Sequence, residues 1–287
     1  MNTFQLNIIS IYGEKGKAWL AKLPELVAAI SSMLDLRNLT EVTNLTYNYV
    51  LSGFQGDNPI ILKLGIDHEY LMQEAFALKC FAGFGAVKML VEDDKILLLE
   101  RAVPGTSLKD YFPNQEDESI KITCGIMKKL HQVNIPVASD FPHIKDWLTA
   151  LDKNLPIPDE YLKKARELRD YLLQTSKLDV LLHGDMHHDN LLQNSNNWVV
   201  IDPKGVIGEP AYEVAAFIRN PIGELLNHAD VINIIQNRIT CFAKFLELPS
   251  QRILDWCFVQ AVLAWVWAIE DGCDTNHFEQ LTKIYNS

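Results

Sequence analysis

The segment that decides the fold is Leu181-Leu182-His183-Gly184-Asp185-Met186-His187-His188-Asp189-Asn190-Leu191-Leu192, and it continues a few residues later as Trp198-Val199-Val200-Ile201-Asp202-Pro203-Lys204-Gly205. An apolar lead-in precedes Asp185, the amide Asn190 follows, and a second acid, Asp202, ends an apolar strand. One carboxylate can orient an attacking hydroxyl and accept its proton, while an amide oxygen and another carboxylate can hold Mg²⁺ on phosphates. The pattern therefore predicts phosphoryl transfer, with Asp185 as the catalytic base and with Asn190 and Asp202 as the metal ligands.

The spacing of these groups matches a known catalytic loop. Asn190 follows Asp185 by five positions, as the amide follows the base in the H-R-D-x-x-x-x-N loop of protein kinases. The sequence H-G-D-M-H-H-D-N resembles the Brenner-type motif of the aminoglycoside phosphotransferase family, in which Gly replaces Arg. Each acid or amide alone would be an ordinary turn former, so the combination carries the prediction.

This resemblance extends from around Leu39 to the end of the chain and implies a fold. We expect a bilobal α+β, protein-kinase-like fold with ATP bound in the cleft. The N-terminal lobe, residues 1–101, would hold a small antiparallel sheet plus one helix. The C-terminal lobe, residues 102–287, would be large and mainly helical, and would carry the catalytic loop and the substrate site.

A lysine in an apolar strand is the next candidate. Lys63 lies within Ile60-Ile61-Leu62-Lys63-Leu64, where a charge is costly unless it is paired. In such kinases a lysine of this kind contacts the α- and β-phosphates, and Glu74, eleven residues later on an expected helix, is its predicted partner; Glu69 is the rival. The alternative is an edge-strand lysine that faces water.

Two further segments are predicted to bind the nucleotide. In the resembling family, the pattern L-L-L-E-R-x-x-P-G-x-x-L marks the linker between the lobes, so the carbonyl of Glu100 and the N–H of Ala102 would contact adenine. The nucleotide-covering loop would be Leu45 to Tyr49. It lacks G-x-G-x-x-G, and the small polar side chain of Thr46 is its predicted contact.

The segment after Asp202 points to one branch of the family. I-D-P-K-G followed by G-[DE]-P-x-Y-[DE] looks like the streptomycin 6-phosphotransferase branch, although Glu209 stands where Asp is usual. Lys204 would reach the phosphates or fix the loop, and a solvent-facing lysine is an equal alternative.

Acidic and aromatic residues gather near the C-terminus, in Trp265-Val266-Trp267-Ala268-Ile269-Glu270-Asp271. Glu270 and Asp271 could bind guanidinium or ammonium groups of a substrate, and Trp267 could offer a cation–π face. A core helix that ends in acids before a glycine is the competing interpretation.

A zinc site is a weaker alternative. His183 and His187 have H-x-x-x-H spacing, which on a helix would place both on one face. Gly184 and the apolar residues that follow favour a loop instead, in which His183 braces the chain.

Composition narrows the class of protein. The 287 residues have a formal net charge of −11, which argues against nucleic acid as a partner and suits a cationic substrate; solubility alone is an equal explanation. Five scattered cysteines, the lack of a signal peptide and apolar runs shorter than the ~18 residues of a membrane span indicate a cytoplasmic protein without a membrane partner. We expect a monomer or a homodimer, and the sequence does not distinguish the two.

The hydrophobic pattern predicts the local elements. We expect a helix over 14–36 with a break or kink at Pro24, strands over 41–45, 49–51 and 59–64, a helix over 67–82, and a hairpin over 87–100 that turns at Asp93-Asp94.

We therefore expect an enzyme that uses ATP and Mg²⁺ to phosphorylate a hydroxyl of a cationic small molecule, such as a streptomycin-like aminoglycoside, and so confers antibiotic resistance. The alternatives are a metabolic kinase of the same fold that acts on choline, homoserine or a thiosugar, and a nucleotide-binding protein that has lost catalysis.

Overall fold

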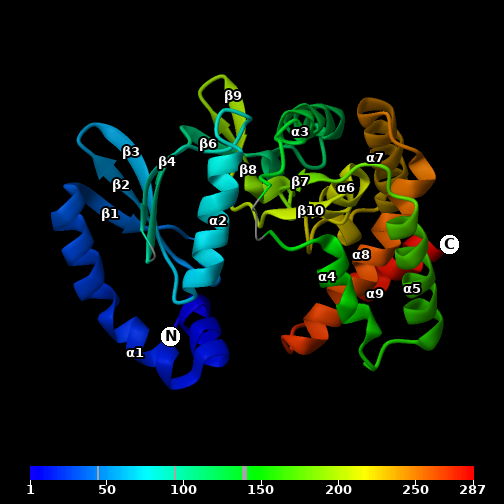
Figure 1. Ribbon diagram of the computed structural model, residues 1–287, viewed down its shortest axis with the longest axis horizontal. Coiled ribbons are helices and arrows are strands. Elements are labelled where there is room, and N and C mark those ends of the chain that lie inside the picture. The colour runs from blue at the N-terminus through cyan, green and yellow to red at the C-terminus, as the bar shows by residue number, and fades with distance from the viewer. Residues whose placement is uncertain (44, 94, 138–140) are drawn as a thin grey trace. The chain divides into compact units, whose positions relative to one another are not determined.

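The computed structural model describes residues 1–43, 45–93, 95–137 and 141–287 (Figure 1). The chain forms two compact units. Unit 1 comprises Met1–Ala82 and Ala86–Gly105, and unit 2 comprises Gly83–Gly85 and Thr106–Ser287.

Unit 1 begins with a long helix, α1 (Thr3–Leu34). Its first turn is closed by a capping box, in which the Asn2 side chain accepts from the Gln5 N–H and the Gln5 side chain accepts from the Asn2 N–H. We predicted a break or kink at Pro24, and the break is wrong, because the helix continues through Pro24 and the backbone leaves helical angles at Gly13, where φ is 55°. Glycine adopts this left-handed conformation without a steric penalty.

A five-stranded antiparallel sheet forms the centre of unit 1, in the order β1-β2-β3-β5-β4. Its strands are β1 (Leu36–Glu41), β2 (Tyr49–Gln55), β3 (Asn58–Leu64), β4 (Met89–Asp93) and β5 (Ile96–Glu100). The strand predicted over 41–45 is wrong, because β1 starts directly after the left-handed cap at Asp35, and Asn44 lies outside the described residues. The predicted hairpin of β4 and β5 is confirmed, although Asp94 also lies outside the described residues.

One apolar layer holds α1 on the sheet. The buried side chains that form it are Phe4, Ile8, Leu23, Leu36, Leu51, Ile60, Leu62, Leu64, Ile96 and Leu98. Their burial, at about 25 cal/mol per Å² of apolar surface, is the main stabilising contribution in this unit. The second helix, α2 (His68–Cys80), starts at Asp67, whose side chain accepts from the Tyr70 N–H.

Unit 2 is mainly helical. Its α-helices are α3 (Glu116–Leu130), α4 (Ile144–Leu148), α5 (Asp159–Gln174), α6 (Pro210–Ile218), α7 (Val231–Leu246), α8 (Ser250–Glu270) and α9 (Asn276–Asn286). Short 3-10 turns are η1 (Leu108–Tyr111), η2 (Thr149–Asp152), η3 (His188–Asn190) and η4 (Leu225–Asn227). Its short strands are β7 (Val180–Leu182), β8 (Leu191–Asn194), β9 (Asn197–Val200) and β10 (Val206–Gly208), while β6 (Pro104–Ser107) lies where unit 1 ends.

Helix α8 is the core of unit 2. It packs against α5, α6, α7 and α9, which Figure 1 shows around it. Every residue from Trp256 to Val266 is buried. By length and composition α8 could cross a membrane, but 72% of its apolar window is buried within this protein, as expected of a core helix.

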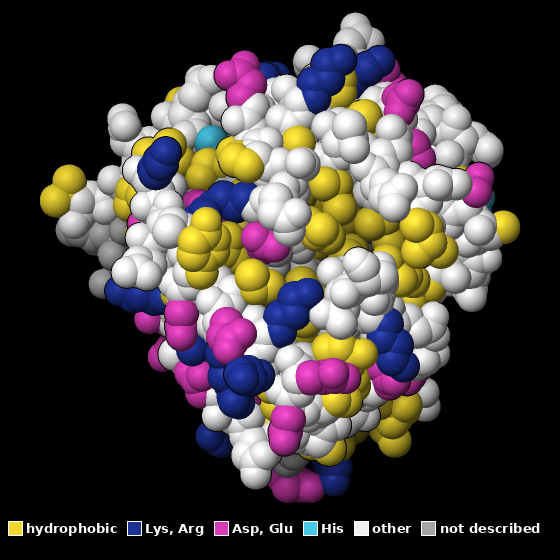
Figure 2. Space-filling view, turned by 90° about the vertical axis from the view of Figure 1, so that its right-hand side faces the viewer, with side chains coloured by type: hydrophobic (Ala, Val, Ile, Leu, Met, Phe, Trp, Pro, Cys, Tyr) yellow, Lys and Arg dark blue, Asp and Glu magenta, His cyan; other side chains and the backbone are white. Residues whose placement is uncertain are grey.

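The face shown in Figure 2 carries acidic and basic side chains in mixture.

The strands of unit 2 place the catalytic segment. β7 pairs antiparallel with β10, and β8 forms a hairpin with β9 in which Leu191 pairs with Val200. Because these two pairs flank residues 183–190 and 201–205, both ends of the predicted catalytic segment are fixed by backbone hydrogen bonds.

Candidate active site

His183 braces the loop that follows β7. The side chain is completely buried; Nε2 lies 2.8 Å from the carbonyl oxygen of Ile201, and Nδ1 accepts from the N–H of Asp185 at 3.3 Å. This pair of contacts requires the tautomer with the proton on Nε2. Both ring nitrogens are thus used within the loop, which argues against the zinc hypothesis, and the described residues contain no cluster of three His, Cys, Asp or Glu side chains able to hold a metal.

A buried carboxylate of α6 binds the backbone of the same loop. The carboxylate of Glu213 accepts the N–H of His183 at 2.6 Å on Oε2 and the N–H of Gly184 at 3.0 Å on Oε1. Glu213 is 1% exposed, so water does not compete for the two oxygens that accept these N–H groups. The sequence contained Glu213 only as the last letter of the G-[DE]-P-x-Y-[DE] pattern, so its contact with the catalytic loop was missed.

Gly184 is required by both backbone and packing. Its φ is +86°, and an added Cβ would lie 3.0 Å from Val206 Cγ1 and 3.1 Å from both Lys204 Cβ and Trp147 Cη2. An arginine of the H-R-D type would therefore not fit this loop. The same contacts place the indole of Trp147 and the stem of Lys204 against the residue that precedes Asp185.

The two predicted metal ligands are connected through the main chain. Asn190 ends η3, its side-chain N–H donates to the carbonyl of Asp185 at 2.9 Å, and its own carbonyl accepts from the N–H of Ile201 at 3.0 Å. Because the amide nitrogen makes the first bond, the side-chain oxygen is the atom available to a cation. Asp202 follows Ile201 in a left-handed conformation, with φ of 58°. An amide oxygen and a carboxylate are the hard oxygen donors that suit Mg²⁺.

Two nitrogen-bearing groups flank the predicted catalytic base. Arg219 Nη2 lies 3.7 Å from Asp185 Oδ1, and His187 Nε2 lies 3.8 Å from Oδ2. Burial of Asp185 raises the pKa of its carboxyl, but the charges of His187, Arg219, Lys204 and His183 together lower this pKa to below its usual value. The carboxyl is therefore ionised at neutral pH, as a proton acceptor must be. Sequence reasoning missed Arg219.

His188, the second histidine of the H-H-D-N motif, has a packing role. It is completely buried and stacks on Phe217 with the ring centroids 3.9 Å apart, and its Nε2 lies 3.4 Å from Arg238 Nη2. Burial and the charge of Arg238 keep the pKa of His188 well below its ordinary value. Arg238 also pairs with Glu116 at 2.6 Å, so this network fixes the base of the catalytic loop.

Lys63 and Glu74 form a buried ion pair in unit 1. Lys63 Nζ lies 2.5 Å from Glu74 Oε2, and the two side chains are 4% and 3% exposed. The predicted pairing is confirmed. The edge-strand alternative is wrong, because β3 lies in the middle of the sheet between β2 and β5. A buried pair of this kind is costly to break, so Lys63 is held at a fixed place on the sheet.

The other residues predicted to bind the nucleotide also lie in unit 1. Glu100 ends β5 and its side chain accepts from the N–H of Lys88 at 2.8 Å, while Ala102 follows and is 7% exposed. Thr46 is exposed, and its carbonyl accepts from the Asn7 side chain at 3.2 Å. Their contacts with a nucleotide stay predictions.

The predicted acceptor residues lie in unit 2 at the end of α8. Trp267 is 36% exposed and meets Trp147 edge to face, with ring centroids 6.2 Å apart. Glu270 forms an ion pair with Lys153, and Asp271 is exposed at the helix cap. Through Trp147, which also touches the Gly184 position, the end of α8 is connected to the catalytic loop.

Lys204 is half-buried. Its backbone N–H donates to the carbonyl of His183 at 2.7 Å, and its charge lowers the pKa of Asp185. It therefore stands beside the predicted base.

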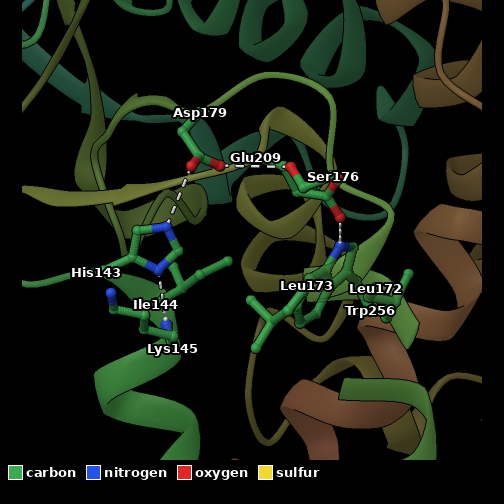
Figure 3. A pocket seen from close by; sticks show the side chains of 9 residues that line it. All are labelled: His143, Ile144, Lys145, Leu172, Leu173, Ser176, Asp179, Glu209 and Trp256. Carbon is green, nitrogen blue, oxygen red and sulfur yellow. Dashed lines mark hydrogen bonds and ion pairs between the residues drawn. The ribbon is translucent and has the colours of Figure 1, made fainter. Parts of the chain in front are cut away.

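A pocket of about 160 Å³ in unit 2 is separate from this set of residues (Figure 3). It is lined by His143, Ile144, Lys145, Leu172, Leu173, Ser176, Asp179, Glu209 and Trp256. Glu209 is bound there by Arg252 at 2.8 Å and by the indole N–H of Trp256. The pocket contains none of the predicted site residues. The Glu209 carboxylate joins the start of α6 to α8.

Comparison with known proteins settles the family. Residues 49–272 match the model of the family described as aminoglycoside/hydroxyurea antibiotic resistance kinase, which is well over half of the chain. The chain belongs to this family of kinases. It is therefore a small-molecule phosphotransferase with a hydroxyl group as acceptor, and the predicted enzyme class is confirmed.

Several curated relatives of this resistance-kinase family align along most of their length. Streptomycin 6-kinase of Streptomyces griseus is 25% identical over 272 residues, which cover 91% of this chain and 87% of the relative. Streptomycin 3''-kinase of Klebsiella pneumoniae is 27% identical, with 78% and 85% covered, and hydroxyurea phosphotransferase of Kitasatospora aureofaciens is 26% identical, with 91% and 77% covered. The predicted resemblance to the streptomycin branch is confirmed.

Solved structures confirm the kinase-like fold. Aminoglycoside phosphotransferase APH(4)-Ia, in a ternary complex with ADP and hygromycin B, aligns with a TM-score of 0.70 at 13% identity, covering 90% of this chain and 96% of that one. A choline kinase from Streptococcus pneumoniae aligns with a TM-score of 0.69 at 15% identity, covering 92% and 99%. At these low identities, the structural alignments show the fold of this chain but say nothing about its substrate.

Proposed function

We propose that this kinase transfers the γ-phosphate of ATP to a hydroxyl of a streptomycin-like aminoglycoside. The observation that carries the proposal is the geometry of the loop that holds Asp185 and Asn190. The Asn190 side chain donates to the Asp185 carbonyl, and the buried carboxylate of Glu213 accepts the N–H groups of the two residues before Asp185. Phosphoryl transfer depends mainly on positioning and charge stabilisation, and a rigid loop supplies the first of these.

Each side chain of the loop has a distinct task. Asp185 orients the attacking hydroxyl and accepts its proton as the new O–P bond forms and the bond from the γ-phosphate to ADP breaks. Asn190 and Asp202 would hold Mg²⁺, which neutralises charge on the phosphates when it is bound. Lys204, half-buried beside Asp185, adds a further positive charge near the reacting groups.

In unit 1, Lys63 would contact the α- and β-phosphates, and Glu74 keeps its ammonium group in place. The backbone of Glu100 and Ala102 would hydrogen-bond to adenine, and Thr46 would contact the phosphates from its loop. Two proteins with similar folds were solved with bound nucleotides, one with ADP and the other with AMP-PNP, which supports nucleotide binding by this fold.

The aminoglycoside assignment depends on charge and on the relatives. Two streptomycin 6-kinases and a streptomycin 3''-kinase are among the similar proteins, and the net charge of −11 attracts a cationic substrate. At the end of α8, the Glu270–Lys153 pair is solvent-accessible, with side chains 31% and 53% exposed, so a substrate guanidinium could replace Lys153. The exposed Trp267 offers an aromatic face beside it.

Hydroxyurea is a second candidate acceptor, because the family description and one relative name it. We further propose a cytoplasmic location, since all five cysteines are free thiols, as in a reducing compartment.

An acceptor screen tests the proposal. The purified protein would be incubated with Mg²⁺ and ATP or GTP, and with streptomycin, hydroxyurea, choline or homoserine in turn. ADP release and the mass of the acceptor would be measured, and NMR would locate the phosphate. We expect acceptor-dependent ADP release and a phosphorylated product with streptomycin. Transfer to choline or homoserine but not to streptomycin would contradict the proposal, and transfer to hydroxyurea alone would favour the second candidate.

A further inference from the structure

Arg219 stands beside the predicted base although no sequence motif marks it. It caps the C-terminal end of α6, its side chain is 15% exposed, and Nη2 lies 3.7 Å from Asp185 Oδ1. Arg219 is 34 positions further along the chain than Asp185, so the two meet only through the tertiary fold.

The guanidinium of Arg219 is held in place by a buried glutamine. Its Nη1 donates to Gln260 Oε1 at 2.5 Å, and the Gln260 side chain in turn donates to the carbonyl of Tyr212 at 2.5 Å. Gln260 lies on α8 and is 5% exposed. The carbonyl of Arg219 also lies 3.1 Å from Nε2 of His277 on α9. Gln260 of α8 thus restricts the guanidinium, and His277 of α9 contacts the backbone of the same residue, so less side-chain entropy remains to be lost when Arg219 acts.

The distances around Asp185 suit orientation better than tight pairing. Arg219 approaches one carboxylate oxygen at 3.7 Å and His187 approaches the other at 3.8 Å, and both distances are longer than a hydrogen bond. At this separation the guanidinium attracts the carboxylate without occupying the lone pairs that must accept the proton of the hydroxyl. A closer, bidentate pair would compete with the substrate for the same oxygens.

We propose that Arg219 is a positioning residue that fixes the direction of the Asp185 carboxylate while both oxygens stay accessible to the acceptor hydroxyl. The inference rests on the proposed role of Asp185 as the base. Its competitor is a purely structural role, in which Arg219 serves only to join α6 to α8.

Single variants give the first part of the test. Arg219→Gln should lower kcat by about 10- to 100-fold with KM for ATP unchanged, because small misplacements of a catalytic group cost rates of this size. Arg219→Lys keeps the charge and should recover part of the loss. Arg169→Gln is the matched control, because Arg169 is 13% exposed and ion-paired with Asp152 at 2.8 Å within the same unit. It should leave kcat within about twofold of wild type. Thermal unfolding of all three would show that they are folded.

A double-mutant cycle separates positioning from structure. Turnover would be measured for Asp185→Asn and for Asp185→Asn with Arg219→Gln, under single-turnover conditions with radiolabelled ATP. If Arg219 acts through Asp185, the second substitution should change the residual turnover by less than about twofold. An equal loss in both backgrounds would overturn the inference, and so would a wild-type kcat for Arg219→Gln.

The cycle also distinguishes failure of the inference from failure of the proposed function. If Asp185→Asn alone keeps wild-type turnover, the assignment of the base is wrong and the inference ends with it. If the residual turnover of Asp185→Asn is too low to measure, the single variants of Arg219 decide. We then expect kcat to fall from wild type to Arg219→Lys and further to Arg219→Gln. Equal kcat for the Lys and Gln variants would then count against orientation by charge.

Discussion

The catalytic loop and the end of α8 are held in opposite ways. The loop is fixed by buried groups that bind its backbone, as Glu213 binds the N–H groups of His183 and Gly184. The end of α8 presents exposed side chains, with Trp267 36% exposed and Glu270 paired with Lys153 at the surface. Buried contacts to backbone set positions accurately, whereas exposed side chains can exchange partners at little cost.

This difference suggests a division of labour between the two regions. The loop should determine the rate of phosphoryl transfer, so substitutions there should lower kcat. The end of α8 should determine which acceptor binds, so substitutions there should change KM for the acceptor. The following variants test this division, in order of decreasing effect on activity.

The largest effect is expected from Asp185→Ala. Loss of the base should lower kcat by about 10²- to 10⁴-fold while ATP still binds, because positioned proton transfer contributes rates of this size. Steady-state kinetics and nucleotide titration would measure both. Asp189→Ala, four positions further along the loop and 45% exposed, is the control and should have a far smaller effect. Substantial residual turnover in Asp185→Ala would contradict the assignment of this loop to catalysis.

Glu213→Gln should have the next largest effect. The amide keeps one acceptor oxygen, but its NH2 group cannot accept a hydrogen bond, so one of the two backbone N–H groups loses its acceptor. The free energy of unfolding should therefore fall by about 1–3 kcal/mol. If about 1.4 kcal/mol of that also appears in the transition state, kcat should fall about tenfold. Calorimetry and initial rates would be compared. A stability loss without any change in kcat would show that the loop tolerates displacement.

Glu270→Gln should act on the acceptor alone. Its ion pair with Lys153 is solvent-accessible, so loss of the charge should raise KM for a cationic acceptor by about two- to fivefold with kcat unchanged. Glu279→Gln, which removes the exposed Glu279–Lys283 pair on α9, is the control. A fall in kcat, or an identical effect in the control, would contradict the assignment of this helix end to acceptor binding.

Glu209→Gln should leave activity almost unchanged. Glu209 lies four positions before Glu213, but its carboxylate binds the side chains of Arg252 and Trp256 instead of the loop backbone. The free energy of unfolding should fall by about 1–3 kcal/mol. In contrast, kcat should stay within about twofold of wild type. If Glu209→Gln lowered kcat as much as Glu213→Gln does, direct contact with the loop backbone would not explain the effect of Glu213 on catalysis.

The sequence predicted those parts of the site that are local in the chain. Asp185 and Asn190 lie on one loop, and the strand β9 ends just before Asp202, so their spacing alone indicates the chemistry. Lys63 and Glu74 were also recognisable, because a lysine inside an apolar strand needs a buried partner and a helix of suitable length follows.

Tertiary contacts explain what the sequence did not predict. Glu213 and Arg219 act on the loop from α6, and nothing in their own segment shows which neighbours they meet. The sequence predicts a break or kink of α1 at Pro24, whereas the helix continues through this proline and leaves helical angles at Gly13. The acceptor residues are least predictable, since exposed charges leave no burial pattern in the sequence.

The most direct test of the account is the binding of Mn²⁺, as a paramagnetic substitute for Mg²⁺, in the presence of a non-hydrolysable ATP analogue. Electron paramagnetic resonance would follow the titration in wild type, Asn190→Ala and Asp202→Ala, with Asn197→Ala at the exposed start of β9 as the control. We expect the first two variants to weaken Mn²⁺ binding by about tenfold or more, with the control unchanged. Wild-type Mn²⁺ affinity in both variants would contradict the assignment of a metal–nucleotide site to this loop.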